Sequence, residues 1–251
     1  MLDTLMARIR QGKRTVAFPV EHPPLPDLFR GLPRMDRAAC NEGCSRCVDV
    51  CPTDAIYLTP DAMDIDLGRC LFCPECERAC PVGALSFTRG YRLAASTRES
   101  LHMDGNHSSP SIEQIGAQLR RLLGRSLKLR AVSAGGCNGC EAEANALGNI
   151  IYDAARFGIE FTASPRHADG LFVTGPVTAN MREALLAAYA AVADPKIVIA
   201  AGACAISGGP FIGHAEVSDG IGDLIPVDLY IPGCPPHPYT LLDGIYRFLK
   251  G

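Results

Sequence analysis

No segment of the sequence is apolar for long enough to cross a membrane. The longest uninterrupted apolar stretches, residues 184–193 and 197–206, stop well short of the roughly 18 residues that a transmembrane helix needs. The N-terminus carries Arg8 and Arg10, but a proline-rich polar stretch follows them instead of the apolar core and cleavage site of a signal peptide. We therefore expect a soluble or peripheral protein that no signal peptide exports.

The sequence also lacks an excess of charge of either sign. Its 251 residues include 24 Lys and Arg and 27 Asp and Glu, a formal net charge of −3. Hydrophobic residues make up 47% and aromatic residues 6%, which is the composition of an ordinary globular protein. This balance argues against a disordered chain and against broad electrostatic binding of nucleic acid.

Cysteine is the residue type that stands out, with twelve copies. The cysteines cluster with prolines, which fits metal ligation in a reducing compartment better than a secreted disulfide framework. Many of them lie in an internal repeat. Each cysteine and proline of its first half recurs 29 positions later: Cys44, Cys47, Cys51 and Pro52 recur as Cys73, Cys76, Cys80 and Pro81.

Changes in the pattern divide the chain into four parts. We expect an N-terminal extension, a small α+β domain that carries the cysteine repeat, a linker with a helix, and an α/β domain, over residues 1–33, 34–92, 93–126 and 127–251. Ser, His, Asn, Gly and Pro predict the linker over residues 96–110. A helix capped by Ser111 is predicted next, from apolar residues at helical spacing: Ile112, Ile115, Leu119, Leu122 and Leu123.

Strand and helix signals alternate in the second half of the chain. Strands are predicted over residues 127–133, 170–174, 196–200 and 227–231. Helices are predicted over residues 141–157, 181–193 and 238–249. This alternation is typical of a parallel sheet covered by helices, in which the carboxyl ends of the strands lie along one edge. The loops at that edge carry the last four cysteines: Cys137, Cys140, Cys204 and Cys234.

The spacing from Cys70 to Pro81 is that of bacterial ferredoxins. In the run Cys70-x2-Cys73-x2-Cys76-x3-Cys80-Pro81, three thiolates hold one 4Fe-4S cluster and the fourth crosses to another. The crossing rule, applied to both halves of the repeat, predicts two ligand sets. The first set is Cys40, Cys44, Cys47 and Cys80, and the second set is Cys70, Cys73, Cys76 and Cys51.

One spacing in the first set departs from this pattern. Three residues separate Cys40 from Cys44 where two are expected, and Gly43 is the residue that can absorb the extra length. Zinc is the alternative metal for these cysteines. It prefers two separated Cys-x2-Cys pairs, so two runs of closely spaced cysteines suit it poorly.

The four cysteines of the second half leave more than one interpretation open. A lone Cys-x2-Cys at Cys137 and Cys140 fits a redox dithiol, with Cys204 and Cys234 as core residues. The four together also fit zinc or a third 4Fe-4S cluster. The cluster would account for all twelve cysteines of the chain.

Motifs in the second half follow one another in a recognisable order. They are Cys137-Asn-Gly-Cys140-Glu-Ala-Glu143, Ser164-Pro-Arg-His-Ala-Asp169, Thr174-Gly-Pro-Val-Thr178, Gly202-Ala-Cys204 with Ser207-Gly-Gly209, and Tyr230-Ile-Pro-Gly-Cys-Pro-Pro236. They resemble the small subunit of membrane-bound, energy-converting NiFe hydrogenases such as formate hydrogenlyase, a family homologous to the 20 kDa subunit of respiratory complex I. The resemblance implies a flavodoxin-like fold whose four cysteines hold a 4Fe-4S cluster.

The N-terminal half resembles a different subunit of the same complexes. Thr15-Val-Ala-Phe-Pro19, Phe29-Arg-Gly-Leu-Pro33 and the two cysteine runs are similar to the eight-iron ferredoxin subunit. The resemblance implies that residues 34–92 form a small α+β dicluster ferredoxin-like domain and that the N-terminal extension contacts a subunit or membrane arm. The chain therefore looks like a fusion of two subunits that are usually separate. Relatives in complex I carry adjacent cysteines where this sequence has Cys137-Asn-Gly-Cys140, and that difference favours the hydrogenase branch.

The resemblance implies an electron-transfer subunit of an oxidoreductase complex, with three 4Fe-4S clusters and the catalytic centre in a NiFe hydrogenase-type large subunit. Further implied partners are membrane-arm subunits and a redox donor or acceptor at the ferredoxin-like end. Nucleic acid is not expected as a partner. The implied location is peripheral, on the cytoplasmic face of the cell membrane. The alternatives are a subunit of a complex I-like quinone-linked or nickel-free hydrogenase-related oxidoreductase, and an iron-sulfur sensor that acts alone.

Several polar residues carry weaker hypotheses. Glu141 and Glu143 follow a cysteine turn, where acidic residues commonly complement a helix dipole, and the resemblance makes Glu143 a candidate proton relay. The resemblance also places the loop of Arg166 and His167 beside the cluster, although hydrogen bonding to nearby backbone is the default for both. The other histidines are expected to be solvated or structural: His102, His107, His214 and His237.

Overall fold

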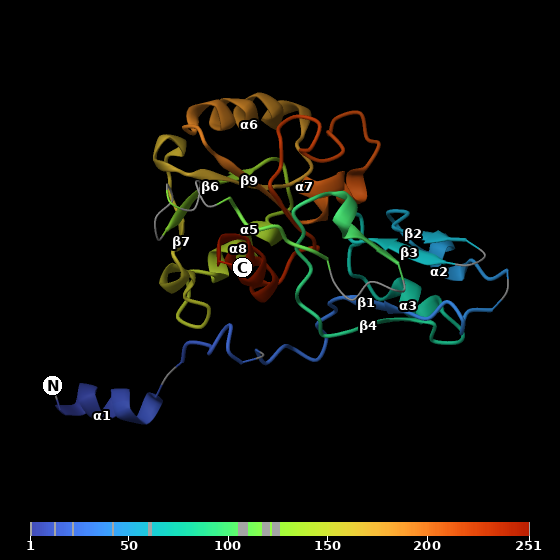
Figure 1. The fold of residues 1–251 in the computed structure, drawn as a ribbon, viewed down its shortest axis with the longest axis horizontal. Coiled ribbons are helices and arrows are strands. Elements are labelled where there is room, and N and C mark those ends of the chain that lie inside the picture. Colours follow the sequence, from blue (N-terminus) through green and yellow to red (C-terminus); the bar gives the residue numbers. More distant parts are fainter. Residues whose placement is uncertain are drawn as a thin grey trace.

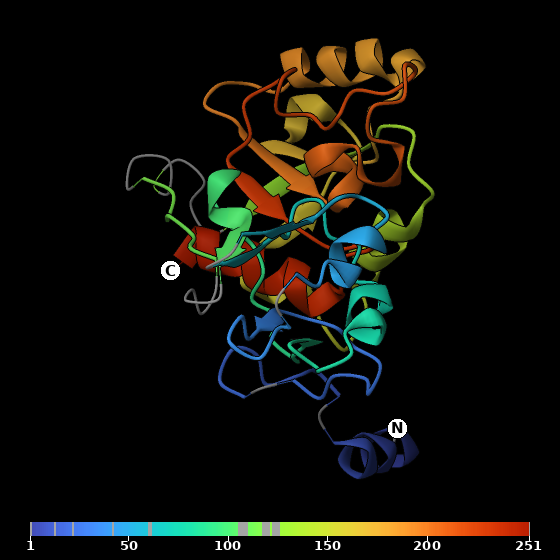
Figure 2. The same ribbon diagram turned by 90° about the vertical axis from the view of Figure 1, so that its right-hand side faces the viewer.

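The structure is a computed structural model that describes residues 2–12, 14–21, 23–41, 43–59, 62–104, 110–116, 121 and 126–250. A C-terminal α/β region and a smaller ferredoxin-like region pack side by side, and an N-terminal helix projects from them (Figures 1 and 2). Short 3-10 helices connect larger elements: η1 (Glu99–Leu101), η2 (Ala154–Phe157), η3 (Pro165–His167) and η4 (Gly209–Phe211).

The α/β region is built on a parallel sheet of five strands. The strands are β6 (Leu127–Ser133), β7 (Ile159–Phe161), β8 (Gly170–Thr174), β9 (Ile197–Ala201) and β10 (Leu229–Ile231). Their order across the sheet is β7-β6-β8-β9-β10, and every pair is parallel. Counted along the chain this is the order 2-1-3-4-5 of flavodoxin-like folds, so the expected fold class is confirmed.

Helices cover both faces of this sheet, as Figure 1 shows. They are α5 (Gly139–Ala146), α6 (Ala179–Ala191), α7 (Ala203–Ser207) and α8 (Pro238–Lys250). Successive residues of a strand point to opposite faces. Phe172 therefore packs in the core cluster of Leu241 and Ile245 from α8, whereas Val173 packs in that of Leu185 from α6. All residues of β8 and β9 are buried.

The helix predicted over residues 141–157 is shorter than expected. Helix α5 ends at Ala146, and strand β7, which the sequence analysis missed, follows η2. The side-chain Oδ1 of Asn149 accepts hydrogen bonds from the backbone N–H groups of Ile151 at 2.8 Å and Tyr152 at 3.1 Å. Such local side-chain bonds compete with the helix ladder, so the chain turns here.

The ferredoxin-like region contains two small antiparallel sheets. One pairs β1 (Pro33–Met35) with β4 (Leu85–Phe87), and the other contains β2 (Ile56–Leu58), β3 (Met63–Asp66) and β5 (His102–Asp104). Short helices α2 (Arg46–Asp49) and α3 (Glu75–Ala79) lie within the two cysteine runs. Strands β2 and β4 begin 29 residues apart, at Ile56 and Leu85. The repeat seen in the sequence is therefore also a structural repeat.

The segment expected to be a linker is partly built into this region. Strand β5 pairs with β3, with Met103 opposite Ile65. Leu101 and Met103 are 0% and 2% exposed. These two apolar side chains fix the segment in the core, although polar residues surround them in the sequence. Residues 105–109, which include His107, lie outside the described residues.

The helix expected from Ser111 does not begin there. Residues 110–116 have no regular secondary structure. Ile115 is buried against α8, and its N–H donates to the carbonyl of Phe248 at 3.2 Å. That tertiary hydrogen bond holds Ile115 in an irregular segment in place of a helix turn. The other apolar positions of the expected helix, Leu119, Leu122 and Leu123, lie outside the described residues.

The N-terminal extension has an exposed part and a packed part. Helix α1 (Leu2–Gln11) buries none of its residues and leaves Leu2 and Ile9 70% and 72% exposed. Farther on, Phe18 is buried against the rings of Phe157 and Tyr246, each with a centroid distance of 5.6 Å. Among the described residues, no helix combines the length and hydrophobicity that a membrane span requires.

One core cluster runs through both regions. It contains Ile65 and Met103 from the ferredoxin-like region as well as Val198 from the α/β sheet. The backbones also pair, because Ala95 and Tyr230 exchange two hydrogen bonds of 3.0 and 2.8 Å. The two cysteine-bearing regions therefore form one packed body.

Candidate metal centres

Four thiols converge at the carboxyl edge of the parallel sheet. Cys137 and Cys140 follow β6, Cys204 lies in α7 after β9, and Cys234 follows β10. All four line one cavity. Cys137 and Cys234 are exposed, whereas Cys140 and Cys204 are partly buried. Sheet topology thus brings together residues that lie up to about a hundred positions apart in the sequence.

The electrostatics of these thiols indicate that they lie close together. Burial raises the pKa of Cys140 to about 12, and the sulfur of Cys204 adds to that effect. Burial likewise raises the pKa of Cys204 to about 11, with Cys234 and Cys137 as the next causes. Such thiols stay protonated at neutral pH unless positive charge replaces the proton, as a bound metal centre does.

Glycine is required where the backbone approaches a sulfur. Gly202 has φ +90°, and a Cβ there would lie 2.6 Å from the Sγ of Cys140. A Cβ on Gly209 would lie 2.9 Å from the Sγ of Cys204. Any side chain at Gly202 would therefore strain the backbone and displace a thiol.

The second predicted ferredoxin set also lines one cavity. Its walls include Ile56 and Ile65 together with the four thiols: Cys51, Cys70, Cys73 and Cys76. Burial raises the pKa of Cys70 to about 12, and the thiols of Cys76, Cys51 and Cys73 raise it further. Cys51 therefore lies with the cysteines of the other half of the repeat, as the crossing rule expects.

The first predicted set shows the reciprocal arrangement. Burial raises the pKa of Cys47, and after the opposing backbone hydrogen bonds the thiols of Cys40 and Cys80 also raise it. The thiol of Cys80, from the second half of the repeat, therefore lies near Cys47 in the first half. Gly43 has φ +71° beside Cys44, a conformation that suits the longer loop between Cys40 and Cys44. The assignment of Cys40 as a ligand stays a prediction.

Backbone amides point at equivalent sulfurs in the two halves. The N–H of Ala55 donates to the Sγ of Cys51, and that of Ala84 to the Sγ of Cys80, both at 3.2 Å. Burial opposes ionisation of Cys80, but backbone N–H groups from residues 82–85 outweigh it and lower the pKa of this thiol. Such N–H donors favour a thiolate and tune the potential of an iron-sulfur cluster.

The arrangement of the donors fits iron-sulfur clusters. Four thiols round a shared cavity are the donor set of a 4Fe-4S cluster, and the second ferredoxin set and the C-terminal set both have it. Among the described residues, no three His, Cys, Asp or Glu side chains are arranged to hold a single metal ion. The assignment of all twelve cysteines to three ligand sets stays a prediction.

The two glutamates after Cys140 differ in their surroundings. Glu141 accepts a hydrogen bond from the Thr174 hydroxyl at 2.7 Å. Burial would raise the pKa of Glu141, but bonds from Ser133 and Thr174 outweigh it and lower that pKa. Glu143 lines a cavity with Cys234 and His237, and burial raises its pKa. Glu141 is therefore a structural anchor, and the proton-relay role of Glu143 stays a prediction.

The expectation for the loop of Arg166 and His167 is wrong. The two residues lie in η3, which precedes β8, and both are exposed. The cysteine loops all follow their strands, so η3 lies at the opposite edge of the sheet. Arg166 is therefore too far along the strands to act on the C-terminal cysteines as a neighbouring charge.

The sequence analysis missed a partly buried ion pair beside the second cysteine set, formed by Asp66 and Arg98. Asp66 is 2% exposed and forms an ion pair with Arg98. His102, which was expected to be solvated or structural, lies 3.8 Å from carboxylate oxygens of both Asp64 and Asp66. The available signal was the pattern Asp-x3-Cys at residues 66–70, which places an acidic residue four positions before the first cysteine of a ligand run.

Fold and cysteine groups together define an iron-sulfur electron-transfer protein of the oxidoreductase type. Residues 137–248 match the family model "NADH ubiquinone oxidoreductase, 20 Kd subunit", and residues 39–84 match "4Fe-4S dicluster domain". The probable membrane-bound hydrogenase subunit mbhJ of Pyrococcus furiosus is 43% identical over 59% of this chain and 89% of its own length. The chain belongs to the family of the 20 kDa subunit of NADH ubiquinone oxidoreductase.

Other relatives show the breadth of this family. Formate hydrogenlyase subunit 7 of Escherichia coli is 48% identical over 53% of this chain and 52% of its own length. An NADH-quinone oxidoreductase subunit of Phocaeicola vulgatus is 51% identical over 44% of this chain and 57% of its own length. The chain thus spans little more than half the length of these two relatives. The resemblance inferred from the motifs is confirmed.

Proposed function

We propose that this chain is the electron-transfer subunit of a membrane-bound NiFe hydrogenase complex of the formate hydrogenlyase type. It holds three 4Fe-4S clusters, and the catalytic centre lies in a partner large subunit. The ligand sets are Cys40, Cys44, Cys47 and Cys80 for the first cluster, Cys51, Cys70, Cys73 and Cys76 for the second, and Cys137, Cys140, Cys204 and Cys234 for the third.

The position of Cys234 carries this proposal. Cys234 lines a cavity together with Leu71 and Phe72, which lie between Cys70 and Cys73 of the second set. Burial raises the pKa of its thiol, and the next causes are Cys137 of its own set and Cys73 of the second set. The second and third sets are therefore neighbours, and the first lies beyond the second through the crossing ligands Cys51 and Cys80. Three centres in this order form a path from the ferredoxin-like end to the carboxyl edge of the sheet.

The chain supplies what a relay of this kind needs. When bound, the clusters take up and release single electrons. Buried side chains such as Ile56 and Ile65 keep water from the second set, and the N–H groups of Ala55 and Ala84 stabilise thiolate charge. No group of the relay has to make or break a bond with a substrate.

The large subunit is proposed to dock at the carboxyl edge of the sheet, where Cys137 and Cys234 are exposed. Two relatives are named as subunits of a membrane-bound hydrogenase and of formate hydrogenlyase. Membrane-arm subunits would contact the N-terminal extension, and a redox donor or acceptor would bind near the first cluster. We place the assembly on the cytoplasmic face of the membrane, with this chain as a peripheral subunit.

A second candidate function follows from the relative named as an NADH-quinone oxidoreductase subunit. In this alternative the chain serves a complex I-like quinone-linked or nickel-free hydrogenase-related oxidoreductase. The separated cysteines of Cys137-Asn-Gly-Cys140 favour the hydrogenase branch. The two functions differ in the metal content of the large subunit.

The test is anaerobic purification of the tagged chain from its native host, with iron, sulfide and nickel quantified and the co-purifying subunits identified. About twelve irons per chain and a nickel-bearing large subunit are expected. Twelve irons with a nickel-free partner would support the second function. About eight irons would contradict the third cluster.

A further inference from the structure

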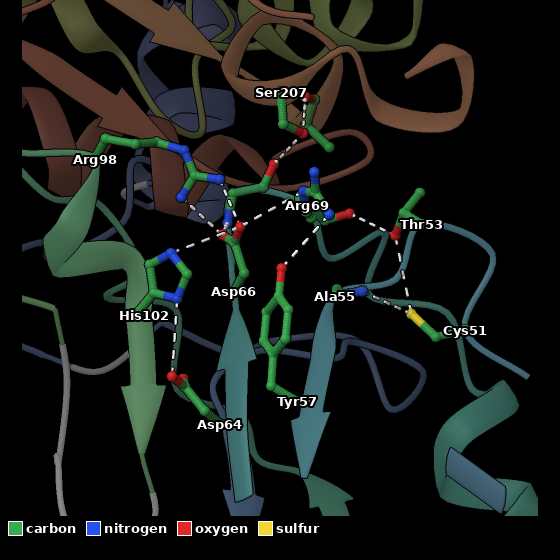
Figure 3. A network of polar contacts seen from close by, with 12 residues as sticks. Cys51, Thr53, Ala55, Tyr57, Asp64, Asp66, Arg69, Arg98, His102 and Ser207 are labelled. Atoms are coloured by element: carbon green, nitrogen blue, oxygen red, sulfur yellow. Dashed lines mark hydrogen bonds and ion pairs between the residues drawn. The ribbon is translucent and has the colours of Figure 1, made fainter. Parts of the chain in front are cut away.

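Helix α7, which carries Cys204, is hydrogen-bonded directly to the turn that leads to Cys70 (Figure 3). The hydroxyl of Ser207 donates to the carbonyl of Gly68 at 2.9 Å, and Ser207 is buried. Gly68 lies two residues before Cys70, and Ser207 lies three residues after Cys204. This bond therefore joins the backbone of the second cysteine set to that of the third.

Asp66 holds the same turn from the other side. Its carboxylate accepts two hydrogen bonds from the guanidinium of Arg98, at 2.7 and 2.5 Å, and one from the N–H of Gly68 at 2.8 Å. Its carbonyl accepts the N–H of Cys70 at 3.0 Å. A bidentate arginine pair fixes both distance and orientation, so the path from Asp66 to Cys70 has little freedom.

Three basic side chains surround the carboxylate of Asp66, namely Arg98, Arg69 and His102, as Figure 3 shows. Arg69 Nε and His102 Nε2 lie 3.9 and 3.8 Å from its Oδ2, outside the Arg98 pair. The carbonyl of Arg69 accepts a hydrogen bond from Thr53 at 2.8 Å. Thr53 lies 3.9 Å from the sulfur of Cys51, so this network also contacts the crossing ligand of the second set.

Gly68 packs tightly between Ile206 of α7 and the side chain of Arg98. A Cβ at this position would lie 2.8 Å from Cγ2 of Ile206 in α7 and 2.8 Å from Cζ of Arg98. Both distances are shorter than side-chain packing allows. A methyl group here would push α7 and the turn apart, although the backbone of Gly68 is not strained.

We propose that Gly68, held between the Asp66–Arg98 pair and Ser207, is a positioning residue that sets the separation of the second and third clusters. This role rests on the proposed function. In the step concerned, one electron leaves one cluster as it enters the other, and no bond or proton changes. The rate of such a step falls steeply with distance, so the spacing at Gly68 controls it.

The experiment compares Gly68→Ala with the wild-type chain, both loaded with iron and sulfide under anaerobic conditions. The control is Gly222→Ala, because the nearest atom to a Cβ there is Tyr230 Oη at 3.9 Å. The readouts are iron content, the magnetic interaction between the reduced second and third clusters, and the rate of electron transfer between them. Gly68→Ala is expected to keep its iron, to weaken the interaction and to slow transfer roughly tenfold.

A compensating variant separates spacing from general damage. Ile206→Ala removes the atom of α7 that a methyl group at residue 68 would meet and leaves the contact with Arg98, which lies on the same side as the turn. Adding it to Gly68→Ala should therefore let α7 return and restore the magnetic interaction. If Gly68→Ala loses iron, Ser207→Ala takes its place. Between α7 and the turn, this variant deletes only the hydrogen bond to the carbonyl of Gly68, and it should still weaken the magnetic interaction. The positioning role would be overturned if Gly68→Ala keeps its iron and the magnetic interaction is unchanged. If Gly68→Ala loses iron, an unchanged interaction in Ser207→Ala would overturn it. A wild-type chain with only eight irons, by contrast, would contradict the proposed function itself.

Discussion

The two cysteine-bearing regions bring their cysteines together in opposite ways. In the ferredoxin-like region, closely spaced cysteines wrap a cavity, and only Cys51 and Cys80 cross between the halves. In the α/β region, the four cysteines come from three loops and meet because parallel strands end at one edge. The first type of site can be read from local spacing, and the second depends on the whole sheet.

The two regions also differ in what surrounds the sulfur atoms of their cysteines. Backbone N–H groups donate to Cys51 and Cys80 in the ferredoxin-like region. In the α/β region, Gly202 and Gly209 leave just enough space for the sulfurs of Cys140 and Cys204. The ferredoxin-like sites therefore depend on hydrogen bonding, and the C-terminal site depends on steric fit.

The largest expected effect is on iron content, when either crossing ligand is replaced by alanine. Cys51→Ala and Cys80→Ala should each lower the iron content from about twelve to about eight per chain. Cys51→Ala should also abolish the magnetic interaction with the third cluster, whereas Cys80→Ala should preserve it, because only the second set adjoins Cys234. The measurement is iron analysis with electron paramagnetic resonance. The opposite pattern would show that the ligands do not cross.

A smaller effect is expected at the strand that the sequence analysis took for a linker. Met103→Ala, in β5, should destabilise the ferredoxin-like region by about 2–5 kcal/mol, because it leaves a cavity at a position that is only 2% exposed. Thermal unfolding of the cluster-loaded chain measures this loss, with Val20→Ala, at a residue that is 90% exposed, as the control. Equal melting temperatures for the two variants would show that β5 does not hold the region together.

The smallest effect on stability is expected at the third site. Gly202→Ala should cost about 1–3 kcal/mol of backbone strain and should displace the sulfur of Cys140, which a Cβ would approach to 2.6 Å. Iron should be lost from the third cluster alone. Gly222→Ala is again the control, and full iron content in Gly202→Ala would argue against steric fit at this site.

The sequence predicts the local features of both regions well. Strands β6 and β8 begin and end where the apolar runs predict. The features it missed join distant residues: Asp66 and Arg98 are 32 positions apart, and Gly68 and Ser207 are 139 apart. Strand β7 was missed because three residues carry too little periodicity to distinguish a strand from the end of a helix.

We propose that the C-terminal cysteines hold the cluster through which electrons reach the large subunit. Cys234→Ala in the assembled complex tests it most directly, with hydrogen-dependent dye reduction measured beside the iron content. We expect the loss of about four irons, retention of the two ferredoxin-like clusters, and a fall in dye reduction to near background. Unchanged dye reduction in a fully assembled complex that carries this variant would contradict it.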